Sequence, residues 1–152
     1  MVSFKLNEKI HKQILINKGR EYIHVKTMEE ISELISALSC KVLNTDNLAE
    51  EICDVYIYLY RIKNILPERN IHVSNKMNNC NIKTWIYYLS STIRCISKGC
   101  LNHTYTDECY KSILNVYNIL ESIINRYNLY RDVQQWIYKK EERDIRIYCK
   151  LK

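Results

Sequence analysis

Residues 28–61 read MEEISELISALSCKVLNTDNLAEEICDVYIYLYR, and this stretch decides the fold. Apolar side chains recur every three or four residues on both sides of NTDN (44–47). That spacing places them on one face of an α-helix, because a helical turn holds 3.6 residues. The polar turn between the two runs predicts that the helices fold back on each other. The stretch therefore predicts a helical hairpin, over about residues 22–66.

The same periodicity continues in both directions along the chain. Only two Gly and one Pro occur in 152 residues, which favours long helices over the many tight turns of a β-fold. The polar segment 67–81 lacks periodicity and is interpreted as a linker or loop. We expect one all-α domain over residues 1–152, a bundle of about six helices. The expected helices cover about 7–17, 22–43, 47–66, 82–98, 106–128 and 131–149.

Several residues predict where these helices begin and end. Gly19 and Gly99 are expected as C-terminal stops, because glycine adopts the left-handed conformation that ends many helices. Asn47, with Glu50 three residues later, resembles a capping box. Pro67 is expected to close the third helix. Val42 falls on the inward stripe of the second helix.

Composition points to a globular protein in a reducing compartment. Hydrophobic residues make up 47% and charged residues 26% of the chain, and no apolar run approaches the roughly 18 residues of a membrane span. Charges run throughout the first 18 residues, so no secretory signal is expected. The seven Cys are an odd number without a C-x-x-C pair, which favours reduced thiols in the cytoplasm, with a zinc site as the minor alternative.

The net charge of +6 lies entirely in the second half of the chain. Residues 1–66 carry nine basic and nine acidic residues, so the whole excess falls in 67–152. A basic second half could face nucleic acid or the phosphates of a small anionic ligand.

A second hairpin over about 82–128 reads as a degenerate copy of the first. Residues 29–39 align with 87–97, and 50–59 align with 111–120, with apolar positions matched. The alternative is that any two amphipathic hairpins align this well. Under the alignment the acids discussed next have no carboxylate counterparts; those positions hold Tyr88, Ser91, Ser112 and Asn115.

Two pairs of acids stand out in the first hairpin. Glu30 and Glu33 are three residues apart, as are Glu51 and Asp54, so the members of each pair share a helix face. Each pair flanks an apolar stripe, and packing of the hairpin would bring both pairs to one groove. Converging carboxylates repel, and a divalent cation such as Mg²⁺, which prefers oxygen ligands, relieves that repulsion. The alternative is two solvated helix faces with ordinary salt bridges.

This arrangement, E-x-x-E followed by a loop and E-x-x-D, resembles the MazG-like all-α nucleoside triphosphate pyrophosphohydrolases, in particular the short phage-type members. KGRE (18–21) and WIYKKEERDIRI (136–147) resemble their flanks. The resemblance implies Mg²⁺-dependent hydrolysis of a nucleoside triphosphate to the monophosphate and pyrophosphate, with Mn²⁺ as a substitute. Related all-α dUTPases make dUTP or dCTP candidate substrates. The metal ligands it implies are Glu30, Glu33, Glu51 and Asp54.

The resemblance also implies roles outside the metal site. Lys140 and Arg143, on the basic C-terminal helix at about 131–149, would contact phosphate. The alternative for this basic pair is a solvated helix face. Within the acidic set, position and chemistry make Glu33 or Glu51 the candidate general base. Ile23 departs from the Gln that many relatives carry, which leaves base and sugar recognition open. Aromatic candidates for base stacking, each with a core role as the alternative, are Tyr22, His24, Trp85 and Trp136.

For partners, the resemblance implies a homodimer in which hairpins pair between subunits, and the second hairpin offers the same pairing within one chain. We expect a nucleotide substrate, no membrane, no nucleic acid, and a cytoplasmic location, in a host cell if the chain is viral. The competing hypothesis is a non-catalytic helical protein whose basic second half binds nucleic acid or a protein.

Overall fold

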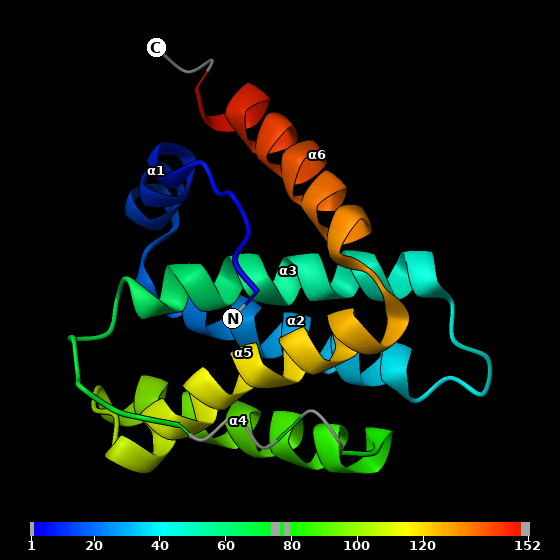
Figure 1. The fold of residues 1–152 in the computed structure, drawn as a ribbon. Helices are drawn as coiled ribbons and strands as arrows, with labels where there is room; N and C mark the ends of the chain where they lie inside the picture. The colour runs from blue at the N-terminus through cyan, green and yellow to red at the C-terminus, as the bar shows by residue number, and fades with distance from the viewer. Residues whose placement is uncertain (1, 74–76, 78–79, 150–152) are drawn as a thin grey trace.

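The computed structural model describes residues 2–73, 77 and 80–149, and this part of the chain contains six α-helices and no strands (Figure 1). The all-α prediction is confirmed. The helices are α1 (Glu8–Lys18), α2 (Arg20–Leu38), α3 (Thr45–Lys63), α4 (Ile82–Asn102), α5 (Asp107–Tyr127) and α6 (Tyr130–Tyr148).

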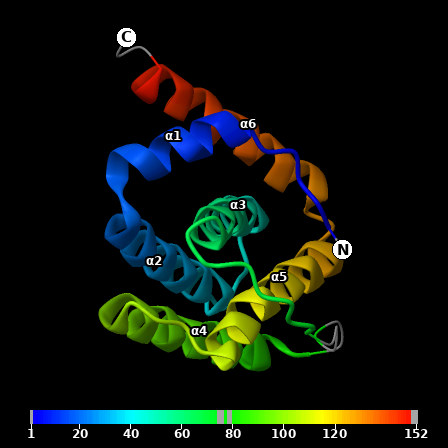
Figure 2. The same cartoon turned by 90° about the vertical axis from the view of Figure 1, so that its left-hand side faces the viewer.

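Helix α3 lies at the centre of the molecule. Figure 2 looks along α3 and shows the other helices arranged around it, with α1 and α6 on the side opposite α4. It packs along α2 to form the predicted hairpin, and it also contacts α1, α5 and α6. The second hairpin, α4 and α5, packs against the first mainly through contacts between α4 and α2. The acidic hairpin is therefore covered on one side by the second hairpin and on the other by α1 and α6.

One hydrophobic cluster connects α2 through α6. Leu34 of α2, Ile52 and Leu59 of α3, Leu89 of α4 and Val133 of α6 are all fully buried in it. Burying a side chain of this size contributes roughly 1.5–3 kcal/mol. Because the apolar stripe of α3 is buried all along its length, the acids next to that stripe have fixed positions.

The turn of the first hairpin differs from the prediction. Helix α2 ends at Leu38 and not near residue 43, and Val42 is 85% exposed in the turn that follows. The cap of α3 is Asn44 and not Asn47. The Asn44 side chain accepts hydrogen bonds from the backbone N–H groups of Asp46 and Asn47, both at 3.1 Å. An Asn at this position satisfies donors that the first helical turn leaves unpaired, and α3 therefore starts earlier than expected.

Gly99 does not stop α4, which continues to Asn102 and ends at His103 in a left-handed conformation (φ 54°). The reason for glycine at position 99 is packing. A Cβ atom added there would lie 2.4 Å from the ring of Tyr105, a side chain that is only 6% exposed. Glycine thus allows the segment after α4 to cross close to the helix.

Other predicted ends agree with the structure. Gly19, at φ 80°, separates α1 from α2. Thr106 caps α5 by accepting from the Cys109 N–H, and Asn128 ends it in a left-handed conformation. By contrast, α3 ends at Lys63 with Asn64 as its C-terminal cap, so the helix stops before the predicted end at 66 and Pro67 does not close it. The described residues of the predicted linker, 67–73, 77 and 80–81, lie in no helix, while 74–76 and 78–79 fall outside the described residues. No described helix is long and apolar enough to cross a membrane.

Candidate metal centre

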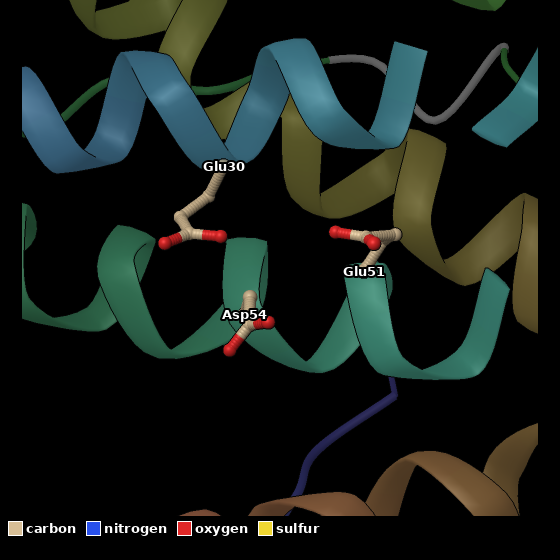
Figure 3. A group of neighbouring side chains, drawn as sticks. All are labelled: Glu30, Glu51 and Asp54. Atoms are coloured by element: carbon tan, nitrogen blue, oxygen red, sulfur yellow. The ribbon is translucent and has the colours of Figure 1, made fainter. Parts of the chain in front are cut away.

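Three of the four predicted acids meet between α2 and α3. Glu30 comes from α2, and Glu51 and Asp54 come from successive turns of α3 (Figure 3). One carboxylate oxygen of each lies within 4.8 Å of the others. Oxygen ligands of one Mg²⁺ ion lie about 3–4 Å apart, so the side chains would close by about an ångström around an ion. Within the described residues, this acidic trio is the one group of three or more side chains placed to hold a metal.

Burial and mutual repulsion perturb the trio. Burial raises the pKa of Glu30 to about 7, with a further contribution from Asp54, although the hydrogen bond from Lys26 opposes the shift. Burial likewise raises the pKa of Glu51 to about 7, assisted by the charges of Glu33 and Asp54. The pKa of Asp54 is also raised by burial, and Lys140 opposes that shift. The three carboxylates therefore carry an electrostatic strain that a cation would relieve.

The donor set fits a divalent cation in another respect. Glu51 Oε2 is buried and has no hydrogen-bond partner. A buried acceptor left unpaired costs about 1–3 kcal/mol. An oxygen-preferring ion held by the trio would give this atom a partner, and carboxylate oxygens are the ligands that Mg²⁺ and Mn²⁺ prefer.

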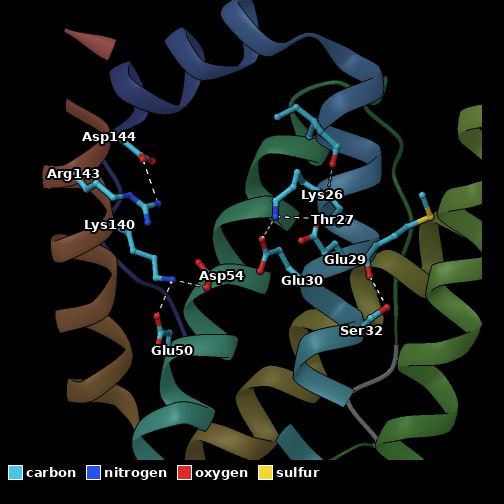
Figure 4. A network of polar contacts seen from close by, with 12 residues as sticks. Lys26, Thr27, Glu29, Glu30, Ser32, Glu50, Asp54, Lys140, Arg143 and Asp144 are labelled. Carbon is cyan, nitrogen blue, oxygen red and sulfur yellow. Dashed lines mark hydrogen bonds and ion pairs between the residues drawn. The ribbon is translucent and has the colours of Figure 1, made fainter. Parts of the chain in front are cut away.

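Two lysines neutralise part of the acidic charge (Figure 4). Lys26 lies on the same helix as Glu30 and contacts its carboxylate at 3.0 Å, and also that of Glu29 at 3.0 Å. Lys140 reaches from α6, and its Nζ donates to Asp54 Oδ2 at 2.5 Å and to Glu50 Oε1 at 3.3 Å. Burial lowers the pKa of Lys140, but the hydrogen bond to Asp54 and the charges of Asp54 and Glu50 together outweigh that effect, and the net shift is upward.

A cleft of about 480 Å³ opens beside the trio. Ligand pockets for small molecules usually measure about 300–1,000 Å³. Part of the cleft wall is apolar and aromatic, and includes Tyr22, Ile57, Tyr58 and Tyr148. The charged lining holds four acids and four bases: Glu30, Glu33, Asp54, Asp144, Lys26, Arg61, Lys140 and Arg143.

A network of buried polar side chains stabilises the part of the cleft wall that Arg61 and Asp144 form. Arg61 Nε donates to His11 Nδ1 at 3.2 Å, and an Arg61 terminal nitrogen contacts Asp144 at 3.2 Å. Because arginine is always a donor, His11 Nδ1 carries no proton and its Nε2–H donates to Glu141 at 2.8 Å. These hydrogen bonds connect α3 to α1 and α6, and they therefore help to fix the positions of Lys140 and Arg143 on α6.

The remaining predicted residues are distributed unevenly around this site. Glu33 is exposed and lines the cleft, but it is not part of the trio. Arg143 lines the cleft with 64% of its side chain exposed and contacts Asp144.

Of the four aromatic candidates for base stacking, Tyr22 alone lines the cleft. His24 and Trp85 are fully buried, which leaves them no free face for a ligand. Trp136 packs on the core and carries the ammonium group of Lys139 over its ring at 4.4 Å.

Sequence reasoning missed Glu50, Tyr58 and Asp144 as neighbours of the site. As the alternative to a metal site, it paired Lys26 with Glu30 and Arg61 with Asp54; the structure pairs Lys26 with Glu30 but Arg61 with Asp144. The Lys26–Glu30 contact is legible in the sequence, because a lysine four residues before Glu30 shares its helix face. Asp144 carried no such local signal.

Comparison with known proteins adds no relative: no family model, curated protein or solved structure matches this chain.

Proposed function

We propose that this protein hydrolyses a nucleoside or deoxynucleoside triphosphate to the monophosphate and pyrophosphate, in the presence of Mg²⁺ or Mn²⁺. The observation that carries the proposal is the acidic trio beside a cleft that two of its members, Glu30 and Asp54, line together with Lys140 and Arg143. Hydrolysis of phosphate anhydrides requires charge neutralisation and an aligned water more than covalent catalysis. A cleft that combines acids able to hold a cation with bases able to contact phosphate supports this chemistry.

Glu30, Glu51 and Asp54 would hold the cation. When bound, it would neutralise charge on the phosphate oxygens and acidify a nearby water. Glu33, an exposed carboxylate on the same cleft, would accept the proton as the water oxygen bonds to the α-phosphorus and the bond to the α–β bridging oxygen breaks. The leaving group is pyrophosphate. Arg143 and Lys140 would bind phosphate oxygens, and Tyr22 would pack against the base or sugar.

The proposed active unit is a single chain. The second hairpin already packs on the acidic hairpin through α4 and α2, which supports pairing of the hairpins within the chain. The homodimer that the resemblance implies remains a prediction, as does the cytoplasmic location.

The test is release of pyrophosphate from a panel of nucleoside and deoxynucleoside triphosphates, dUTP and dCTP among them, with Mg²⁺ or with a chelator. The same samples are unfolded thermally across a Mg²⁺ titration. Wild type should release pyrophosphate in the presence of Mg²⁺ and not in the presence of the chelator. Mg²⁺ at a hundred times its Kd should raise the free energy of unfolding of wild type by about 2.7 kcal/mol.

Glu51→Gln and Asp54→Asn should lose both properties. Glu8→Gln, on the exposed part of α1, is the matched control and should keep both. A folded wild type that shows neither Mg²⁺-dependent stabilisation nor pyrophosphate release would contradict the proposal and favour the non-catalytic binding protein.

A further inference from the structure

The contact between Lys140 and the acidic trio indicates a second property of the site. Of the two lysines at the trio, Lys26 sits on α2 next to its own partner Glu30, one turn away. Lys140 comes from a different helix, 86 residues from Asp54 in sequence, and donates directly to Asp54 Oδ2 at 2.5 Å. It thus places a positive charge directly against a carboxylate that a metal ion would use.

We infer that Lys140 acts as a built-in cation that occupies Asp54 while metal is absent and must leave Asp54 for Mg²⁺ to bind. An ammonium group and a divalent ion held against the same carboxylate group repel each other. This inference rests on the proposed function, because it requires that the trio binds a divalent cation.

The cleft offers an alternative position for the Lys140 ammonium group. It lines the same cleft as Arg143, one turn further along α6, so a released ammonium group faces the space where phosphates would lie. Lysine carries a flexible four-carbon stem and a point charge, which suits exchange between two anionic partners. An anionic ligand in the cleft would therefore draw Lys140 away from Asp54.

Coupling between metal and phosphate follows. A ligand that holds Lys140 away from Asp54 raises the affinity of the trio for Mg²⁺, and by linkage Mg²⁺ raises the affinity for that ligand equally. The resting protein would bind free Mg²⁺ weakly and bind it well only together with a polyphosphate. Metal loading would thus depend on the presence of substrate.

The experiment measures cation affinity directly, with no turnover. Mn²⁺ binding to wild type and to Lys140→Met is followed by the electron paramagnetic resonance signal of free Mn²⁺, in the absence of nucleotide. Methionine keeps the apolar stem and removes the charge. Lys140→Met should bind Mn²⁺ at least about fivefold more tightly than wild type, the lower end of typical coupling between sites.

Lys139→Met is the matched control. It removes the same charge from the adjacent position of α6, where the ammonium group contacts the Trp136 ring. Its Mn²⁺ affinity should stay within about twofold of wild type, because an exposed charge is screened by solvent. Equal tightening in both lysine variants would indicate only a change of net charge, and would overturn the inference.

A second readout follows the lysine itself. The Lys140 ammonium group lies 5.7 Å from the centre of the Trp136 ring, so its departure should change Trp136 fluorescence. Mn²⁺ quenches by itself, so Mg²⁺ is used, with circular dichroism to verify folding. The signal should change in wild type and stay constant in Trp136→Phe and Lys140→Met.

The outcomes separate the two proposals. If wild type binds Mn²⁺ and Lys140→Met binds it no more tightly, the inference is wrong and the metal site stands. If neither folded protein binds Mn²⁺, the metal site is wrong, and the role of Lys140 falls with it.

Discussion

At the scale of single residues, the acidic trio should make the metal-free protein sensitive to pH. The pKa values of Glu30 and Glu51 rise from 4.5 to about 7 on folding, chiefly through burial. Between these values the folded protein keeps protons that the unfolded chain has lost, so the free energy of unfolding falls as pH rises from about 4.5 to about 7. Stability contributed by the protonated carboxyls is thus complete below pH 4.5 and lost through pH 7.

The measurement is urea unfolding at pH 5 and pH 8 in a chelator. Other groups also titrate in this range, so the informative quantity is the difference between variants. Glu51→Gln, which cannot ionise, should lose less stability between the two pH values than wild type and should be the more stable protein at pH 8. Glu8→Gln should behave as wild type. An identical loss in wild type and Glu51→Gln would show that the Glu51 carboxylate is not strained in the folded state.

Also at this scale, the candidate acids could be selected from sequence because their relation is local. Glu51 and Asp54 share a face through the helical repeat alone, and only the fold-back of one hairpin was needed to bring in Glu30. Glu33 shows the limit of that reasoning. Its spacing from Glu30 matches that of the other pair, yet it is exposed and lies outside the trio. Spacing along one helix does not specify which side of that helix faces its neighbour.

At the scale of elements, the second hairpin should have a structural role and no metal chemistry. The positions aligned with the acids offer no carboxylate, and Ser112 Oγ is already hydrogen-bonded to Thr92 Oγ1 of α4 at 2.7 Å. Ser91→Ala and Asn115→Ala should therefore change pyrophosphate release by less than about twofold, as expected for positions remote from the chemistry. Steady-state kinetics on both variants tests this, with circular dichroism to verify folding. A loss as large as that of Glu51→Gln would place the second hairpin in the active site.

Gly99 gives a stability prediction for the same hairpin. Gly99→Ala should destabilise the protein by about 1–3 kcal/mol, because a methyl group would collide with the Tyr105 ring and overpacked sites cannot relax freely. Lys98→Ala, the exposed neighbour on α4, is the control and should have little effect. Thermal unfolding measures both. If Gly99→Ala is as stable as wild type, the Tyr105 ring can move aside and the close approach is not required.

Helices were easier to predict than their ends. A stripe of apolar residues along nearly twenty positions identifies α2 and α3, since many residues carry the same signal. The end of a helix depends on only one or two residues, and neighbouring residues can be equally suitable as the cap. Asn44 and Asn47 are both acceptable caps, and the structure uses Asn44. Gly99 looked like a stop because glycine often ends helices, whereas here it serves a contact with Tyr105 that only the folded chain reveals.

At the scale of the whole molecule, the cleft is the part that sequence predicts least well. It forms because α6 crosses α3 on the side opposite the second hairpin (Figures 1 and 2). Lys140 and Asp54 are 86 residues apart in the sequence. The periodicity within each helix does not predict that these two side chains meet. The resemblance pointed to Lys140 and Arg143 as a pair, but the structure gives them different surroundings, with Lys140 half-buried against Asp54 and Arg143 exposed.

Substitutions of the two arginines that contact Asp144 should distinguish a structural role at the cleft from a role in ligand binding. Arg61 is 4% exposed and connects His11 to Asp144, whereas the Arg143 side chain is 64% exposed. Arg61→Met should cost about 3–5 kcal/mol of stability, because it breaks the buried ion pair with Asp144 and the hydrogen bond to His11. Arg143→Met should cost less than about 0.5 kcal/mol, as usual for a surface position, but should raise KM for the triphosphate about tenfold, because charge-assisted contacts to phosphate are strong. Urea unfolding and steady-state kinetics on both variants give the comparison. An Arg143→Met protein with unchanged KM and kcat would place this side chain on a solvated face of α6 and leave Lys140 as the phosphate contact on that helix.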